Sequence, residues 1–158
     1  MAQGGVSATR FTLDSNVLIY SIDRIEGAKH EAARHILLHA VRHDCWLTLQ
    51  SLSEFYAVVT RKRIMPPLEA AAQVQDWLAL FRLVAVTADA IRAAMANAAA
   101  GRASYWDALL VATAAQAGCT LLLTEHMADG ARLGGVEIHN PFTRSGGLTA
   151  RARRLLEL

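Results

Sequence analysis

Short apolar, β-prone runs alternate along the chain with segments whose apolar residues recur at helical spacing. Between the first two runs, for example, Ala33, Ile36, Leu37 and Ala40 repeat every three or four residues. Parallel strands are joined by crossovers of this kind, because the chain must return to the starting edge of the sheet. The alternation therefore predicts an α/β fold, a parallel sheet with helices on both faces. We expect strands at 11–13, 46–49, 82–86, 119–123 and 136–138.

The length of 158 residues suits one domain, and a hydrophobic content of 53% supplies a core without metal or disulfide staples. This composition excludes a disordered or collagen-like chain. We expect an N-terminal extension at 1–10, the folded domain at 11–143 and a basic C-terminal tail at 144–158. The sequence leaves open whether the tail packs on the domain, binds a partner or is disordered.

The sequence indicates neither a membrane protein nor a secreted one. No stretch approaches the roughly 18 apolar residues of a membrane span, and residues 1–10 contain no apolar targeting segment. Cys45 and Cys119 suit the core of a protein in a reducing compartment better than a disulfide. We therefore expect a cytoplasmic protein without a membrane partner. Its net charge of +2 excludes a polycationic tail protein.

Several acidic residues fall where strands are expected to end. Asp14 directly follows the first strand, Glu54 opens the helix after the second, and Glu125 and Asp129 follow the fourth. Asp107 begins the apolar helix that leads into that fourth strand. Open α/β sheets place their chemistry at the carboxyl ends of the strands. We therefore expect these carboxylates to converge on one rim of the sheet.

Helix capping is the alternative interpretation of each acid taken alone. Ser51 and Glu54, like Ser104 and Asp107, have the spacing of a capping box. Capping does not explain why acids from four segments should converge, however, and converging carboxylates stay ionised only with cations between them. An all-oxygen ligand set selects Mg²⁺ or Mn²⁺ over zinc. Such ions align a water molecule and neutralise charge on a phosphodiester.

The same segments carry motifs that are specific in combination. They are LDSNVL at 13–18, SEF at 53–55, SYWDALLVA at 104–112 and LTEHMADG at 123–130. In this order, over about 11–142, they resemble the PIN-domain family, particularly VapC-type toxins of bacterial toxin–antitoxin pairs. The resemblance implies a Rossmann-like three-layer sandwich with a central parallel sheet of about five strands flanked by helices.

The resemblance also implies an activity and partners. A protein of this family is a Mg²⁺- or Mn²⁺-dependent endoribonuclease that hydrolyses RNA phosphodiester bonds with one or two ions per site. It acts as the toxin of a type II toxin–antitoxin pair, is inhibited by a small antitoxin protein, and forms a homodimer or higher homo-oligomer. Asp14, Glu54 and Asp107 fall on the three acidic positions, so they are expected to bind metal and to be catalytic. Asn16 and Thr124 match polar residues that line the same pocket.

The chain departs from the family at the fourth acidic position. His126 stands where the family usually has aspartate, between Glu125 and Asp129. We expect Asp129 to replace that acid as a catalytic metal ligand. His126 is then a candidate Mn²⁺ ligand or phosphate contact, and Glu125 is a candidate polar residue of the same pocket.

Basic residues near these motifs are candidates for contacts with the RNA backbone. Arg61 and Arg63 end the helix that contains Glu54, where favourable charge at a helix C-terminus is the alternative interpretation. Arg102 precedes the Asp107 motif. The competing functional hypothesis is a catalytically weak or defunct PIN-like module that binds RNA or protein. Phosphatases and phosphoacceptor domains are disfavoured, because they need a second acid after the first strand and a suitably placed lysine. The sequence does not say which RNA is cut.

Overall fold

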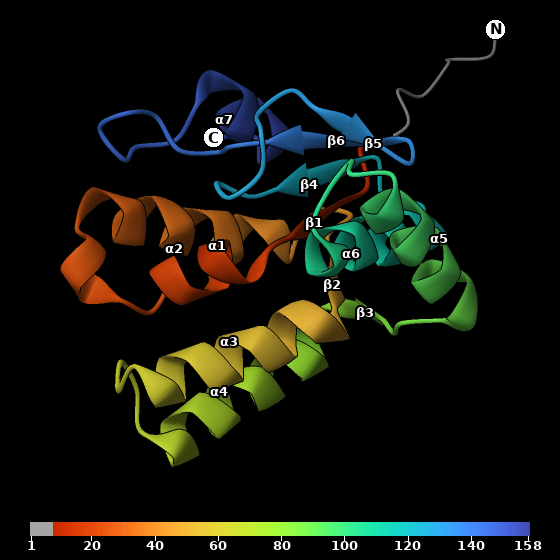
Figure 1. Ribbon diagram of the computed structural model, residues 1–158. Coiled ribbons are helices and arrows are strands. Elements are labelled where there is room, and N and C mark those ends of the chain that lie inside the picture. Colours follow the sequence, from red (N-terminus) through yellow and green to blue (C-terminus); the bar gives the residue numbers. More distant parts are fainter. Residues whose placement is uncertain (1–7) are drawn as a thin grey trace, which may run out of the picture.

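Parallel strands form the centre of this computed structural model, which describes residues 8–158 (Figure 1). In the larger sheet, of order β1-β4-β6-β5, the strands β1 (Phe11–Leu13), β4 (Leu121–Leu123) and β6 (Val136–His139) are parallel, and β5 (Arg132–Leu133) is the antiparallel edge. The strands β2 (Trp46–Thr48) and β3 (Arg82–Val84) pair in parallel, and a bridge from Phe11 to Cys45 joins them to β1. This mostly parallel sheet confirms the predicted fold class. Most of the expected N-terminal extension lies outside the described residues.

Helices separate the strands from β1 to β4, as the alternation of the sequence predicted, whereas β4, β5 and β6 follow one another without a helix between them. The helices are α1 (Ser15–Tyr20), α2 (Ala28–Ala40), α3 (Leu49–Arg61), α4 (Pro67–Leu80), α5 (Ala88–Ala99), α6 (Tyr105–Gln116) and α7 (Ala150–Leu155), with a short 3₁₀ helix η1 (Arg24–Glu26) before α2. In Figure 1, α3 and α4 lie together below the sheet and α7 lies above it. Within the described part of the chain, no helix is both long and apolar enough to cross a membrane.

The core explains how α3 and α4 are held on the sheet. Phe55 is fully buried and meets Trp77 edge to face, with ring centroids 4.7 Å apart. Edge-to-face pairs of this kind add about 0.5–1.5 kcal/mol to the gain from burial. Both residues belong to the same cluster as Phe11 and Leu13 of β1. The position of α3, and with it Glu54, is therefore fixed by the main core.

The C-terminal segment is part of the packed structure. Leu148, Ala152 and Leu156 are buried in the main cluster. Arg151 makes two hydrogen bonds to the Glu137 carboxylate on β6, at 2.9 and 2.7 Å. Of the three possibilities that the sequence left open for residues 144–158, the structure has the segment packed on the domain.

Candidate functional site

Asp14 lies at the carboxyl end of β1 and caps α1. Its side chain is only 5% exposed. One carboxylate oxygen accepts a hydrogen bond from the backbone N–H of Ser15 at 2.7 Å, and the other accepts from the Thr124 hydroxyl at 2.8 Å. The capping interpretation is thus correct for Asp14, but the second oxygen is held by a residue 110 positions away.

The electrostatic setting of Asp14 is unusual for a buried acid. Burial raises the pKa of Asp14 above its usual value, against the opposing effect of the hydrogen bonds from Thr124 and Ser15. The negative charge of Glu54 raises that pKa further, while His126 lowers it. The donors to Asp14 are neutral, so its negative charge is not compensated by a partner cation among the hydrogen-bonded groups.

Glu54 is brought to Asp14 by Ser15. The Ser15 hydroxyl donates to Glu54 Oε2 at 3.0 Å and lies 3.5 Å from Asp14 Oδ1. On α3, the Gln50 side-chain amide donates to Glu54 Oε1 at 3.2 Å. Thr48 is the N-cap of α3, because the helix begins at Leu49 and the Thr48 hydroxyl accepts from the N–H of Ser51. Glu54 therefore lies beyond the capping position, and its side chain is directed to the Asp14 edge.

Asp107 lies in the first turn of α6. Ser104 caps this helix by accepting from the backbone N–H of Asp107 at 3.2 Å, so the predicted capping spacing is realised here. The Gln50 amide also donates to the main-chain carbonyl of Trp106 at 3.1 Å. Gln50 therefore links the Glu54 carboxylate to the start of α6, one residue before Asp107.

The loop after β4 completes this edge of the sheet. The buried Thr124 hydroxyl, while donating to Asp14, accepts from the Asn16 side-chain amide at 3.0 Å and from the His126 N–H at 3.1 Å. The Asn16 carbonyl oxygen lies 3.4 Å from the Glu125 N–H, which donates to it. A hydroxyl can make this set of one donated and two accepted bonds through a single atom. The structure thus places the side chains of Asn16 and Thr124, and the backbone N–H groups of Glu125 and His126, in one hydrogen-bonded network with Asp14.

Glu125 belongs to a compensated cluster with Tyr20 and Lys29. The Tyr20 hydroxyl donates to its carboxylate, and Lys29 Nζ lies 2.9 Å from Oε2. Burial acts to raise the pKa of Glu125, but the bonds from Tyr20 and Lys29 outweigh it and hold the pKa below the usual range. Burial and the Glu125 carboxylate raise the pKa of Tyr20. No motif or spacing pointed to Tyr20 or Lys29.

Asp129 is directed away from the acid pair. Its Oδ1 accepts from the backbone N–H of Asn140 at 2.9 Å and lies 3.0 Å from His139 Nδ1. His139 Nε2 lies 2.8 Å from the hydroxyl of Thr149, the N-cap of α7. The Gly130 N–H donates to the Ile138 carbonyl at 2.8 Å, so the turn follows β6 at this point. The contacts of Asp129 therefore tie the loop to β6 and α7.

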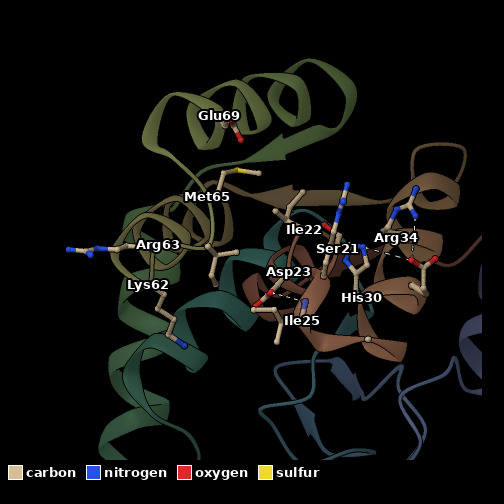
Figure 2. Close-up of a pocket in the computed structure, with 14 residues that line it drawn as sticks. Ser21, Ile22, Asp23, Ile25, His30, Arg34, Lys62, Arg63, Met65 and Glu69 are labelled. Carbon is tan, nitrogen blue, oxygen red and sulfur yellow. Dashed lines mark hydrogen bonds and ion pairs between the residues drawn. The ribbon is translucent and has the colours of Figure 1, made fainter.

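The basic candidates lie in two separate places. Arg61 and Arg63 are exposed at the far end of α3, about 10 Å along the helix axis from Glu54. Arg63 lines an open groove of about 1100 Å³ between the α1–α2 region and the α3–α4 turn, and Figure 2 shows its side chain extending away from Asp23 on the opposite wall. Arg102 instead shares a smaller hollow with Asp107.

The donor set for a divalent ion is assembled only in part. Asp14 and Glu54 offer two carboxylates beside each other, and Gln50 Oε1 is a buried oxygen without a hydrogen-bond partner in the described structure. These oxygen donors fit the ligand preference of Mg²⁺ and Mn²⁺. Among residues 8–158, however, no three His, Cys, Asp or Glu side chains are grouped closely enough to hold a metal ion. Ser15 and Gln50 were not predicted, although Gln50 precedes Glu54 by four residues, a spacing that places both on one helix face.

The chain matches a protein-family model and is similar in fold to solved structures. The PIN domain family model matches residues 11–126. No curated protein matches. Solved structures that share the fold include the sarcin–ricin-loop-cleaving toxin VapC20 of Mycobacterium tuberculosis, at 16% identity and TM-score 0.56, over 71% of this chain and 86% of that one.

Two complexes are also similar in fold. VapBC2 of Rickettsia felis, bound to a DNA fragment from its promoter, matches with 14% identity and TM-score 0.60, covering 84% of this chain and 98% of that one. DNA-bound VapBC of Salmonella typhimurium matches with 18% identity and TM-score 0.59, covering 83% and 97%. At these identities the likeness concerns the fold, which is the one built here from β1, β4 and β6.

Proposed function

Because this chain belongs to the PIN domain family, we propose that it is a metal-dependent endoribonuclease that hydrolyses RNA phosphodiester bonds. We propose further that it is the toxin of a type II toxin–antitoxin pair, because its structural neighbours include the toxin VapC20 and the complex VapBC2. The observation that carries the proposal is the buried Asp14 carboxylate, which has neutral hydrogen-bond donors and the acid Glu54 beside it. Such a pair needs a cation to remain ionised.

In this proposal Asp14, Glu54 and Asp107 hold Mg²⁺ or Mn²⁺, one or two ions per site. A bound divalent ion supplies a nucleophilic water at neutral pH and neutralises charge on the phosphate. Thr124 and the Ser15 N–H fix the Asp14 carboxylate, and Gln50 fixes that of Glu54. These hydrogen bonds restrict the rotamers of both acids, which lowers the cost of ordering them around an ion.

The remaining polar groups act on the substrate. The backbone of His126 is held by Thr124 while its side chain is exposed, so the imidazole is free to contact an RNA phosphate. Asp129 is the proposed replacement for the fourth acid, but to serve as a ligand it would have to give up its bonds to His139 and Asn140. Arg61, Arg63 and Arg102 are the proposed contacts to the RNA backbone.

We propose that the antitoxin segment binds the large groove drawn in Figure 2. Ile22 and Ile25 lie on one wall, and Met65 of the α3–α4 turn lies on the other. The Ile25 side chain is 94% exposed, so it is accessible to an apolar side chain of a partner. Loss of antitoxin binding on Ile25→Asp substitution, with RNA cleavage retained, would support this location.

A cytoplasmic homodimer completes the proposal. Large apolar side chains are exposed on α5 and at the start of α6, among them Met95 at 51% and Trp106 at 63%. Burial of these side chains against a second copy of the chain would remove them from water. Light scattering of the purified protein measures the assembly directly, and a monomer at all concentrations would contradict it.

The nuclease is tested with purified protein and structured RNA in Mg²⁺ or Mn²⁺. We expect cleavage that stops when a chelator is added and resumes when excess ion is restored. Cleavage that ignores the chelator would contradict the metal mechanism. Adding the chelator after the RNA has bound, and following binding separately, distinguishes loss of chemistry from loss of affinity.

A binding module without catalysis is the second candidate. It is favoured by His126 at the fourth acidic position and by the absence, within residues 8–158, of a group of three ligating side chains. This candidate predicts RNA or protein binding with no cleavage of any RNA in either ion. Cleavage by the wild-type protein that is lost in Asp14→Asn would exclude it.

A further inference from the structure

A hollow of about 410 Å³ lies beside Asp107, outside the contacts that join the acid pair. It is bounded by the loop before α6 on one side and by the loop after β4 together with β5 on the other. Its floor is apolar: Ile138 is 1% exposed, and Met127 and Leu133 pack against the same small core cluster. An apolar floor opening beside a candidate reactive acid is a place where part of a substrate can be held.

The rim of this hollow carries two arginines whose charge is largely available. Arg102 donates to the neutral side-chain oxygen of Asn97 at 3.1 Å. Arg132 is 69% exposed and lies 3.5 Å from Glu137, but Arg151 already binds that carboxylate through two shorter bonds. The lining includes two positively charged guanidinium groups and one negatively charged carboxylate, that of Asp107, which leaves one net positive charge at the opening. The rim is therefore complementary to a phosphate, and the floor is complementary to an apolar surface.

An unpaired nucleotide combines both kinds of surface. The faces of a nucleobase are apolar and its phosphate is anionic, whereas in a duplex the faces are covered by stacking. The volume is at the lower end of the range for small-molecule sites, which suits one base. A guanidinium plane can also stack on a base or bind a phosphate through paired N–H groups.

We propose that this hollow is a subsite for one unpaired base of the RNA substrate, with Arg102 and Arg132 binding the adjoining phosphate. The inference rests on the proposed ribonuclease function and deepens it. The protein then selects single-stranded segments, such as loops, because a paired base cannot enter. Asp107 is one of the residues that line the subsite, so a nucleotide held here lies beside this proposed catalytic acid.

The test compares two labelled single-stranded oligoribonucleotides, one with bases and one abasic, of equal length and charge. Affinities are measured by fluorescence anisotropy with the full chain carrying Asp14→Asn, to prevent cleavage. We expect the base-bearing strand to bind about tenfold more tightly, the lower end of what base stacking contributes. Ala128→Trp, which fills the hollow, should abolish this ratio and leave the affinity for the abasic strand unchanged.

The arginines are tested through salt dependence. Arg102→Gln and Arg132→Gln should each weaken the binding of both strands and reduce the slope of log affinity against log salt by about 0.7. Arg82→Gln is the matched control: its side chain is 70% exposed, against 69% for Arg132, but it lies at the amino end of β3. It should leave both affinities within about twofold, a change of less than about 0.5 kcal/mol.

The outcomes separate this subsite from the proposed function. Equal binding of the two strands, no binding of either, or an unchanged ratio in Ala128→Trp would overturn the subsite, even if the wild-type protein cleaves RNA. A ratio that Ala128→Trp abolishes would support the subsite even if no RNA is cleaved, in which case the nuclease proposal fails alone. Thermal unfolding checks that each variant is folded. Met127→Ala, which removes part of the floor, serves in place of Ala128→Trp if that variant does not fold.

Discussion

Two acidic clusters lie side by side at the carboxyl edge of the sheet and differ in how their charge is balanced. In one, Asp14 and Glu54 share the Ser15 hydroxyl and receive neutral donors. In the other, Glu125 is bound by the ammonium of Lys29 and the hydroxyl of Tyr20. The pKa of Asp14 is raised, chiefly by burial, whereas that of Glu125 is lowered in spite of burial.

The difference indicates which cluster is suited to bind a ligand and which maintains the structure. A buried acid with a cationic partner is satisfied within the fold and stabilises it. A buried acid beside another acid is destabilising until an external cation arrives. The two clusters are joined through Asn16 and Thr124. The Glu125 cluster, whose charge is compensated, therefore supports the position of the Asp14–Glu54 pair, whose charge is not.

The largest expected effect is the loss of RNA cleavage in the Asp14→Asn and Asp107→Asn variants. Each should lower the cleavage rate more than about a hundredfold, because even the partners of metal ligands contribute about 10- to 100-fold. The measurement is initial rate under excess ion, with the fold checked by circular dichroism. Full activity in either variant would remove that residue from the site.

Asp129→Asn is the variant with which Asp14→Asn and Asp107→Asn are compared in this experiment. The Asp129 side chain is 61% exposed and already bonded to His139 and Asn140. A loss as large as that of Asp14→Asn would establish Asp129 as the fourth ligand. A rate within a few fold of wild type would confine the metal chemistry to the other three acids.

An intermediate effect is expected on stability from Glu125→Gln. Loss of the charged hydrogen bonds to Tyr20 and Lys29 should lower the free energy of unfolding at pH 7 by about 1–2 kcal/mol. Because folding lowers the pKa of Glu125 from its usual 4.5, its contribution is present above that pH and is lost as pH falls through the folded-state value. Chemical denaturation across this range measures the effect, and Glu157→Gln at an exposed position is the control. A difference between variant and wild type that persists at low pH would contradict the assigned cause.

The smallest expected effect has the opposite sign. Asp14→Asn should raise the stability at pH 7 by about 1 kcal/mol, or the melting temperature by about 2–4 °C, because the neutral amide removes a buried charge beside Glu54. Because folding raises the pKa of Asp14, the free energy of unfolding of the wild-type protein falls as pH rises from the usual value of 3.8 through the folded-state value. The gain should therefore disappear below that range. Saturating Mg²⁺ should reduce the gain, because it stabilises the wild-type protein only. A destabilised variant at neutral pH would show that the charge is already compensated.

The sequence predicted that Asp14 and Glu54 lie near each other, because both residues come shortly after predicted strands. Asp14 and Glu54 each come after a short apolar run, and the carboxyl ends of parallel strands meet at one edge. Asp129 also follows such a run, but the turn at Gly130 directs it toward β6. That direction depends on backbone geometry over a few residues, which periodicity does not encode. Tyr20 and Lys29 had no signal at all, because their partner lies about 100 positions away along the chain.

The sequence by itself determined the alternation of strands and helices, the parallel sheet and the edge at which the acids lie, because these depend on local spacing. The tertiary structure decided which side chains form hydrogen bonds or ion pairs with one another. Ser15 meets Glu54 across 39 positions, Tyr20 meets Glu125 across 105, and Thr124 meets Asp14 across 110. The packing of residues 144–158 was decided in the same way, through Leu156 and the main core. Long-range contacts of this kind arise from how the layers pack, so the sequence predicts the edge at which the acids lie but not that the charge of Asp14 is uncompensated while that of Glu125 is compensated.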